Sequence, residues 1–580
     1  MAAPATIDRR RRTVKTGSNI LLAVLMVCAM LFAGACTAGE GGENPFVAGA
    51  FDKAKIDAAI ASADTIKPVE GVTGIIVPHH LLAADLIARG FKAASAGSYD
   101  RIVMLAPDHF RAVSGGFGTT RAGFETVYGA VETDTAAVEE LAGGNALMEM
   151  RGNLSHEHGV VALMPFVKHF FPDTPVVALI AAIDTTPDQW RAMAASLRSV
   201  VTEKTLVVQS TDFSHYLPLD QAVLRDQESL GVIAANDPEQ VPPLIQPDHL
   251  DTKAGLYIQM RLQREIFSSH PVVIANSNSA EYSGIAENTT SYVTAVYLRD
   301  AEAGTSLVPD DQRVVYFGGD VLLGRYLTPV LLEEGAREAV TQKILAVTHG
   351  RPLIINLEGV ILDEPVAGLW DDAHLMLREL AVPVLKDIGV VAVSLANNHS
   401  RDLGIVGFDE TRRILRGAGI IPLEHGKDAD TGAVRVTAAN YIAGRDSEPA
   451  LYRNPQDSGA VCNLDAAPPL VAFMHWGREY TSEAGSKERE TARVLAGCGV
   501  QVIVGAHSHQ ASVRVDNVPG QAVSMVYSLG NLLFDQSMDK STSALLEVRV
   551  FGSGTVFTRL IGLPNLFRFG NAHMRAEAVE

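Results

Sequence analysis

Short apolar runs alternate with amphipathic segments along almost the whole chain. Runs at 314–317, 470–474 and 500–504 have the length and β-branched content of buried strands. Segments 333–350 and 487–499 carry apolar residues at helical spacing and end at or near glycine, as helix C-termini prefer. Strands that alternate with helices are typical of α/β domains, and we expect the fold class to be α/β throughout.

The chain has 580 residues, which is too long for one hydrophobic core. A polar stretch with Gly and Pro, residues 301–312, follows an alternating strand-like segment and precedes the apolar run at 314–317. We therefore expect a first domain at 67–300, a linker at 301–312, a second domain at 313–565 and a C-terminal tail at 566–580.

The N-terminus predicts export and attachment to a membrane. Residues 9–12 and Lys15 are basic, residues 20–32 are apolar but too short for a permanent span, and Cys36 follows small residues in a lipobox-like site. Residues 1–35 then form a signal peptide, acylation of Cys36 anchors the protein to a bacterial cell membrane as an extracytoplasmic lipoprotein, and residues 36–66 form a flexible tether. A plain signal peptide or an uncleaved anchor is the alternative.

The net charge excludes nucleic acid as an expected partner. Removal of residues 1–35, which carry five basic residues and one acidic residue, takes the formal charge from −19 to about −23. Such a surface repels nucleic acid and anionic polymers, so an anionic substrate must be held by metal ions and local arginines.

Two cysteines remain beyond the lipobox, Cys462 and Cys498. In an oxidising compartment they can pair. Cys498 lies in an apolar segment and is equally explained as a small buried residue, so the sequence leaves the disulfide open.

Metal-capable side chains follow five apolar runs in the second domain. The carboxyl ends of parallel strands meet at one edge of a sheet, so residues from these runs can share one crevice. Two histidines spaced i, i+2 after the run at 500–504 point the same way if that segment is extended. Oxygen and imidazole ligands suit Mn, Fe or Zn, and a pair of such ions supports hydrolysis. The candidate ligands are Asp320, Glu358, Asn398, His475, His507 and His509.

These segments resemble a known family. GGDVLLGR, NLEG, SLANNHSRDLG, HWGREY, GAHSH and YSLGNLLFD occur in the order found in the CapA family of poly-γ-glutamate (capsule) synthesis proteins, a branch of the calcineurin-like metallophosphatases. The resemblance implies a four-layer αββα fold and a dinuclear site. It assigns one ion to Asp320 and His509, the other to Asn398, His475 and His507, and a bridging role to Glu358. It also implies that His399 donates a proton to the leaving group and that Arg325 contacts an anionic substrate.

One residue departs from the calcineurin-like pattern. These enzymes usually begin with Asp-x-His, but the position two after Asp320 is Leu322. Two functions therefore stay open: a metal-dependent phosphoesterase or hydrolase linked to capsule or poly-γ-glutamate biosynthesis, and a non-catalytic envelope factor that binds or guides a capsular polyanion. The expected partners are the membrane, a capsular polymer or phosphoester substrate, and other envelope biosynthesis proteins.

Histidines also follow apolar runs in the first domain, in PHH, PDH, HEH and DFSH segments. These segments resemble the Memo-like family (AmmeMemoRadiSam system protein B), whose fold is related to class III extradiol dioxygenases. The resemblance implies a pocket, and a single Fe or Cu ion is one interpretation of it. A metal-free pocket is the other, because no third ligand is evident near Ala280. The pocket residues are His79, His109, His158, Asp212 and His215.

Overall fold

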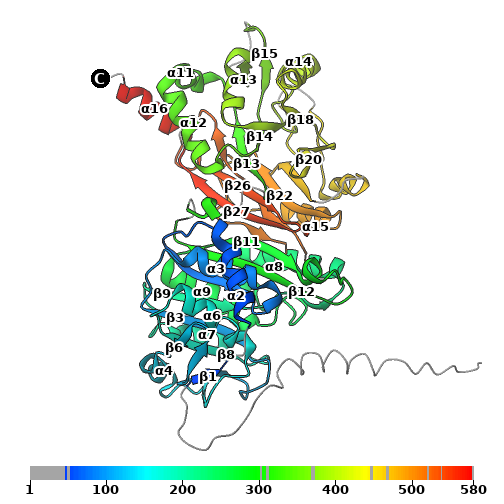
Figure 1. Ribbon diagram of the computed structural model, residues 1–580. Coiled ribbons are helices and arrows are strands. Elements are labelled where there is room, and N and C mark those ends of the chain that lie inside the picture. Colours follow the sequence, from blue (N-terminus) through cyan, green and yellow to red (C-terminus); the bar gives the residue numbers. More distant parts are fainter. Residues whose placement is uncertain are drawn as a thin grey trace, which may run out of the picture.

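The computed structural model describes residues 46–48, 52–300, 303–307, 312–366, 373–444, 449–464, 469–518, 521–536 and 538–577. They form two lobes stacked end to end, and the second lobe lies above the first in Figure 1. The predicted signal peptide and Cys36 lie outside the described residues. Among the helices that the structure describes, none is both long and apolar enough to cross a membrane.

A nine-stranded sheet forms the centre of the first lobe, in the order β10-β12-β2-β9-β3-β8-β4-β7, with β11 paired to β12. Strands β2, β9, β3 and β8 are parallel neighbours. The strands of this sheet are β2 (Val72–Val77), β3 (Arg101–Pro107), β4 (Phe117–Thr120), β7 (Met148–Arg151), β8 (Val176–Ala181), β9 (Thr205–Ser210), β10 (His215–Leu217), β11 (His270–Asn278) and β12 (Thr289–Leu298). A small second sheet contains β1 (Phe46–Ala48), β5 (Gly123–Thr126) and β6 (Gly129–Val131).

Helices cover both faces of the large sheet, because its strands are apolar on both faces. In β3, Ile102 and Met104 pack into one core, while Val103 and Leu105 pack into the other. The helices of this lobe are α2 (Lys53–Ser62), α3 (Ala84–Ala94), α4 (Thr135–Ala142), α5 (His158–Val161), α6 (Met164–Phe170), α7 (Pro187–Leu197), α8 (Leu219–Ala235), α9 (Lys253–Leu262) and α10 (Ser279–Ser283).

Two segments that we expected outside the domains are folded. Helix α2 lies within the predicted tether and buries Ile56 and Ala59 in the core of the first lobe. The predicted C-terminal tail contains α16 (Leu566–Glu577), which packs against α12 (Glu334–Thr348), and Leu566 is 1% exposed. Both segments carry apolar residues that the folded lobes bury, so residues 53–62 are not part of a flexible tether and residues 566–577 extend the second lobe.

The second lobe contains two stacked sheets. One is seven-stranded, with the order β18-β17-β14-β13-β26-β27 and β25 paired to β13; the other is six-stranded, with the order β19-β20-β21-β22-β24-β23. The first contains β13 (Arg313–Val321), β14 (Leu353–Leu357), β17 (Val390–Ser394), β18 (Ile421–Leu423), β25 (Asn531–Leu533), β26 (Ser543–Val550) and β27 (Val556–Leu563). The second contains β19 (Asp428–Asp430), β20 (Arg435–Asn440), β21 (Leu470–His475), β22 (Val500–Ala506), β23 (Asp516–Asn517) and β24 (Ser524–Val526).

Alternation along the strands produces four layers. Val315 and Phe317 of β13 meet Val471 and Phe473 of β21 between the sheets. The outer face of the first sheet is covered by helices, and that of the second by α15 and the 3-10 helix η7. The other α-helices of this lobe are α11 (Thr328–Leu332), α13 (Arg378–Asp387), α14 (Gly404–Gly417) and α15 (Ser486–Ala496). The lobe also contains the 3-10 helices η6 (Arg325–Leu327) and η7 (Pro455–Asn463) and the strand pair β15 (Val360–Leu362) and β16 (Leu375–Leu377). The predicted α/β class with two domains is confirmed.

A disulfide joins Cys462 in η7 to Cys498, just beyond α15, with a Cα–Cα distance of 4.4 Å. The sequence left open whether these two cysteines pair, and in the structure they do. It closes a segment of 36 residues that includes β21.

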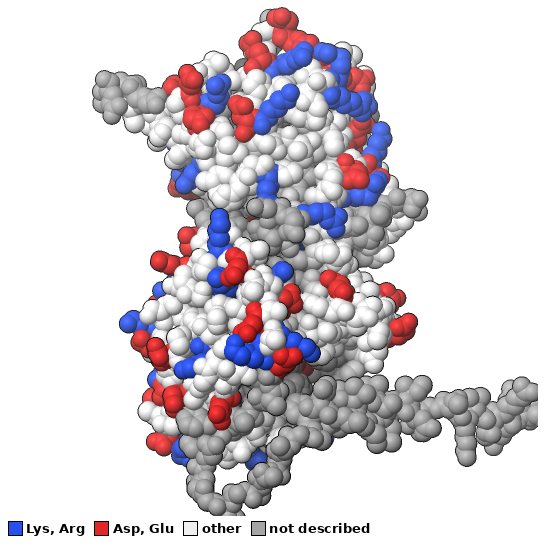
Figure 2. Space-filling view, viewed as in Figure 1, with Lys and Arg blue, Asp and Glu red and all other residues white. Residues whose placement is uncertain are grey.

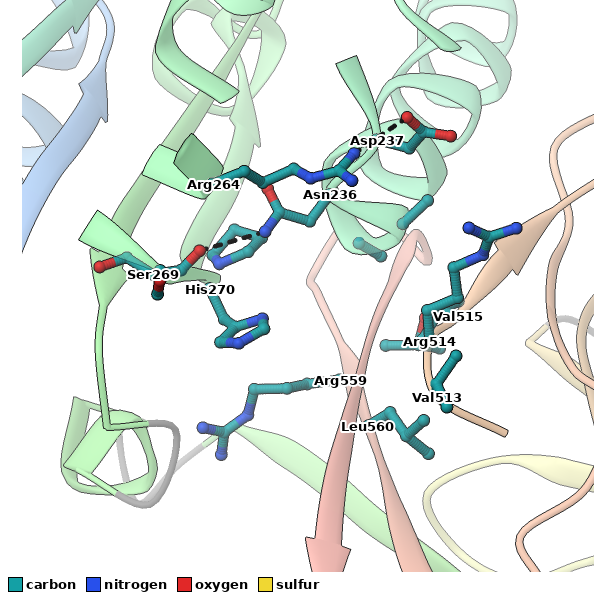
Figure 3. A pocket seen from close by; sticks show the side chains of 15 residues that line it. Asn236, Asp237, Arg264, Ser269, His270, Val513, Arg514, Val515, Arg559 and Leu560 are labelled. Atoms are coloured by element: carbon teal, nitrogen blue, oxygen red, sulfur yellow. Dashed lines mark hydrogen bonds and ion pairs between the residues drawn. The ribbon is translucent and has the colours of Figure 1, made fainter. Parts of the chain in front are cut away.

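The two lobes meet where the β26–β27 hairpin reaches α8 and β11 (Figure 1). A buried charge cluster lies at this junction. Burial alone would raise the pKa of Glu547, but Arg549 and Arg559 outweigh it and lower the pKa to about 2. A cavity of about 370 Å³ lies beside the hairpin and is lined from both lobes. In Figure 3 the Arg264 side chain points to Asp237 at its edge, and the two side chains are 3.1 Å apart.

Basic and acidic side chains are interspersed on the surface. Figure 2 shows several Lys and Arg side chains on the upper part of the second lobe, with acidic side chains around them. Arg412 and Arg413 of α14 pair with Asp409 and Glu410. The positive charge on this helix is therefore offset locally.

Candidate functional site

The six candidate ligands of the second lobe come from the carboxyl ends of strands in both sheets. Asp320 is the penultimate residue of β13. Glu358 directly follows β14, and Asn398 follows β17 by four residues. His475 ends β21, and His507 directly follows β22. Because β13, β14 and β17 are parallel, and so are β21 and β22, these ends meet at one edge of the sandwich.

The structure brings these residues together as two buried triads that share one carboxylate. Asp320, Glu358 and His509 form the first triad, and Glu358, His475 and His507 form the second; within each, the donor atoms lie within 4.8 Å of one another. Asn398 Oδ1 lies 2.7 Å from His475 Nε2. Glu358 therefore occupies the position between two donor sets, which is where a bridging ligand has to be.

We expected an extended backbone around His507 and His509, but the structure shows a turn there. His507 has φ 87° and His509 has φ 56°, both in the left-handed region that L-residues rarely adopt. The His507 N–H donates to Asp320 Oδ2 at 3.0 Å, so the turn binds the first carboxylate through its backbone as well. Both rings reach the cluster because the chain turns after β22, and the alternation argument was wrong.

Three asparagines form a layer behind the triads. Asn356 Nδ2 donates to Asp320 Oδ1 at 2.8 Å, and Asn397 Nδ2 donates to Asn356 Oδ1 at 3.2 Å. Asn531 Oδ1 lies 2.7 Å from His509 Nδ1. Such contacts fix the orientation of a ligand, and a carbonyl oxygen at Nδ1 favours the tautomer with a free Nε2 lone pair.

Buried charge at this site favours a cation. Burial raises the pKa of Glu358 well above its usual range, and neighbouring Asp320 raises it further. Burial, together with His507, lowers the pKa of His475 well below its usual range, so this imidazole is neutral. Glu358 Oε1 is buried, and the described chain supplies it no hydrogen bond, although His475 Nε2 lies 3.2 Å away. Burial also lowers the pKa of His507 to about 4, whereas Asp320 and Glu358 outweigh burial at His509 and raise its pKa to about 9. Two clustered carboxylates beside the neutral imidazoles of His475 and His507 fit a divalent ion.

Leu322 stands where the calcineurin-like pattern has a histidine, and it is fully buried in the outer core of the second lobe. Its backbone N–H donates to Leu533 of β25. The position is therefore built into the core, and the first triad draws its imidazole from His509.

The predicted proton donor lies in a second group beside the triads. His399 Nδ1 is 3.0 Å from Asp402 Oδ2, which also accepts the backbone N–H of His374 at 2.9 Å. The His374 ring stacks on the His399 ring, with centroids 3.6 Å apart and planes 21° apart. In-plane lone pairs of stacked rings do not converge on one point, so this group is a poor metal site. With Nδ1 facing a carboxylate, His399 keeps Nε2 for chemistry.

Arg325 is held in place by a carboxylate. It has φ 50°, and its Nε lies 3.0 Å from Asp535 Oδ2. Its side chain is 28% exposed, so part of the guanidinium still faces solvent. Burial lowers the pKa of His374, and the charges of His399 and Arg325 lower it further.

The predicted pocket residues of the first lobe also converge. The rings of His79 and His109 are 5.0 Å apart, and His158 stacks on His109 at 4.0 Å. His79 Nε2 lies 3.5 Å from Asp212 and 3.2 Å from Asp251. His215 lines a neighbouring cavity of about 240 Å³ together with His109 and Asp251.

Carboxylates control the charge of this pocket. Burial lowers the pKa of His109, but Asp251 and Glu157 outweigh it and raise the pKa to about 10. Burial and the adjacent Asp251 raise the pKa of Asp212 to about 8. His109 Nδ1 faces Glu157 at 2.7 Å, and Asp251 Oδ1 is buried with no hydrogen-bond partner in the described chain. An unpartnered buried carboxylate oxygen beside two imidazoles can accept a cation or a donor group.

Comparisons with known proteins divide the chain in the same way. The model of the family described as Memo-like protein matches residues 44–296, and that of the Bacterial capsule synthesis protein PGA_cap matches residues 314–438 and 437–536. A Memo-like domain precedes a capsule synthesis domain in this chain. Both resemblances expected from the motifs are confirmed.

Each of the curated relatives matches only one of the two domains. The PGA biosynthesis protein CapA of Bacillus subtilis (strain 168) is 27% identical over 273 residues, 42% of this chain and 70% of that protein. A MEMO1 family protein of Nitrosopumilus maritimus (strain SCM1) is 25% identical over 178 residues, 30% of this chain and 64% of that protein. This chain thus spans about two thirds of each relative. An uncharacterized protein from Escherichia coli K12 aligns with 38% of this chain and 99% of its own at 13% identity, with a TM-score of 0.27 that supports no argument.

Several residues of both sites carried no signal in the sequence. In the capsule synthesis domain these are Asn356, Asn397 and Asn531, whose role depends on contacts between strands. In the Memo-like domain, Asp251 lies in a loop with no strand before it, so no rule about strand ends could select it.

Proposed function

We propose that this protein is an extracytoplasmic, membrane-attached hydrolase of phosphoester bonds that depends on metal ions and acts in capsule or poly-γ-glutamate biosynthesis. The observation that carries the proposal is the pair of buried triads that share Glu358. Asp320 and His509 would hold one ion, and Asn398, His475 and His507 the other. Two Mn, Fe or Zn ions there would polarise a phosphoryl oxygen and lower the pKa of a water molecule to near neutrality.

The protein's own residues supply the remaining functions. His399, oriented by Asp402, presents Nε2 as a proton donor for the leaving oxygen. Arg325, braced by Asp535, offers the exposed part of its guanidinium to an anionic group of the substrate. The buried walls around Glu358 exclude bulk water, which strengthens each of these electrostatic contacts.

The link to capsule biosynthesis rests on the matched family and on the CapA relatives. Attachment to the membrane rests on the predicted signal peptide and Cys36. Cys36→Ala should release the protein from the membrane fraction or leave the precursor uncleaved. Unchanged fractionation with an unchanged mature mass would exclude the lipoprotein.

A non-catalytic role in binding or guiding a capsular polyanion is the second candidate, and buried Leu322 favours it because one imidazole of the calcineurin-like pattern is missing. One experiment separates the two. The purified soluble chain is loaded with Mn, its metal content is measured, and phosphodiester and phosphomonoester substrates are screened. Turnover that disappears in His475→Ala supports the hydrolase, whereas full metal content without turnover favours the polymer factor.

For the Memo-like domain we propose a single Fe or Cu ion held by His79, His109 and Asp251. Two imidazoles and one carboxylate form a donor set that leaves coordination positions open. The proposal rests on the distances of 3.2 Å and 3.7 Å from Asp251 Oδ2 to the two Nε2 atoms. Asp251→Asn should lower iron content at the first lobe while manganese content at the second lobe stays at the parental value.

A further inference from the structure

The turn between β26 and β27 of the capsule synthesis domain packs against the Memo-like domain, and its two ends are buried there. Phe551 and Phe557, at the two sides of the turn, are 4% and 1% exposed and pack into a core of the Memo-like sheet. Thr555 Oγ1 donates to Asn276 Oδ1 of β11 at 2.6 Å, and Ser553 Oγ donates to the same oxygen at 3.1 Å. Thr555 is fully buried, and its Oγ1 also lies 2.7 Å from Ser553 Oγ, so both hydroxyls belong to one hydrogen-bonded group at Asn276 Oδ1.

Side chains also bind the backbone of the opposite domain. The N–H of Val556 donates to Gln227 Oε1 of α8 at 2.8 Å, and Gln227 Nε2 donates to the Val556 carbonyl at 3.1 Å. From the other side, Arg549 Nη1 donates to the carbonyl of Val273 at 2.9 Å. Buried polar groups that lose their partners are costly, so these contacts favour only the docked arrangement.

Asn276 connects this turn to the Memo-like pocket. Its Nδ2 donates to Asp226 Oδ2 at 3.1 Å and to the carbonyl of Tyr292 in β12 at 3.3 Å. The Tyr292 hydroxyl lies 2.7 Å from His80 Nδ1, next to pocket residue His79.

The neighbouring residue of β12 holds the loop of the pocket. The Ser291 carbonyl accepts the N–H of Phe213 at 2.9 Å, and the Ser291 N–H donates to the carbonyl of Ser214 at 2.9 Å. Phe213 and Ser214 lie between Asp212 and His215, both of which belong to the Memo-like pocket. A short path of hydrogen bonds, joined by the peptide bond between Ser291 and Tyr292, therefore runs from the other domain to this loop.

We propose that the turn 551–555 acts as a built-in partner of the Memo-like domain, whose docking holds β12 and the 212–215 loop in the geometry of the pocket. The capsule synthesis domain then controls the order of the Memo-like pocket, whether or not it hydrolyses phosphoesters. The proposal depends on contacts across the junction and not on metal in either cluster.

Thr555→Val in the full chain tests the proposal, because valine keeps the shape and removes the hydroxyl. Thr558→Val is the matched control: Thr558 lies three residues further along the chain in β27, is 1% exposed, and its Oγ1 has no hydrogen-bond partner in the described chain. Amide hydrogen exchange measured by mass spectrometry on a peptide that covers 211–217 reports local opening. We expect exchange about 2- to 10-fold faster in Thr555→Val, the factor for one buried neutral hydrogen bond, and parental exchange in Thr558→Val.

Two results would overturn the proposal. One is parental exchange at 211–217 in Thr555→Val. The other is equal acceleration in both variants, or over all peptides, since general destabilisation would then explain it. Asn276→Ala supplies a second measurement: combined with Thr555→Val, it should accelerate exchange by less than the product of the two single effects.

Discussion

Glu358→Gln is the most informative change at the dinuclear cluster, because Glu358 belongs to both triads and the substitution keeps its shape. In the metal-free protein, burial and Asp320 already make a charge on Glu358 unfavourable. The neutral amide removes that cost, so stability without metal should be unchanged or greater. With metal the sign reverses, because an amide oxygen is a weak and uncharged ligand and both ions lose their shared carboxylate.

The size of the effect follows from linkage. An ion present at about 100 times its Kd stabilises the folded state by about 2.7 kcal/mol. For a domain of about 150–250 residues, 1 kcal/mol shifts Tm by about 2–4 °C, so each bound ion should raise the parental Tm by about 5–10 °C. Calorimetry of chelator-stripped protein titrated with Mn, Fe or Zn measures this rise, and mass spectrometry after gel filtration counts the ions. Glu358→Gln should lose most of the rise.

Glu424→Gln is the matched control for this experiment. Glu424 pairs with Arg412, Arg416 and Lys427 near α14, its side chain is 14% exposed, and it belongs to neither triad. The Glu424→Gln variant should keep the full metal-induced rise in Tm, with at most a small loss of stability. A parental protein without any metal-induced rise, or a Glu358→Gln variant with the full rise, would refute the shared-ligand interpretation.

Three further changes test other parts of the structure. His399→Ala should keep metal content at the parental value and slow any hydrolysis that needs leaving-group protonation by about 10²–10⁴, measured with substrates of differing leaving-group pKa. The pKa of Glu547 is lowered from 4.5 to about 2. The charged carboxylate therefore adds on the order of 3 kcal/mol to the free energy of unfolding above pH 4.5, and this stability is lost as pH falls toward 2. Glu547→Gln should therefore unfold more easily near pH 7 and lose less stability than the parent between pH 4.5 and 2, as followed by denaturant titration. Replacing Cys462 and Cys498 together by Ala should cost about 2–4 kcal/mol in the same assay, since the bond closes 36 residues.

Much of the fold and of the convergence of the candidate ligands could be predicted because strand periodicity and strand-end positions are local signals. Asp320, Glu358 and His475 each end an apolar run, and the parallel pairing of those strands brings them together. His507 and His509 both lie beside Glu358, but an extended backbone is not the reason. The left-handed turn that directs both rings depends on the contact with Asp320, which lies far away in the sequence.

The remainder depends on contacts between distant segments. Asp251 and His374 lie in loops, and their importance comes from what they face: His79 in one case and the His399 ring in the other. Helix α2 has a weak amphipathic pattern, so the tether prediction missed that Ile56 fits the core of the first lobe. Such positions become visible only when the folded neighbours are known.

Both proposed functions of the capsule synthesis domain require that the cluster around Glu358 attract an anionic molecule. A formal net charge of −19 opposes the approach of a polyanion, and the arginines of α14 are offset by Asp409 and Glu410. Attraction for an anionic substrate or polymer must therefore come from ions at the shared carboxylate of Glu358, assisted by Arg325. If Glu358→Gln abolishes binding of an anionic polymer and hydrolysis together, one cluster serves both functions; loss of hydrolysis alone would require a second binding surface elsewhere on the lobe.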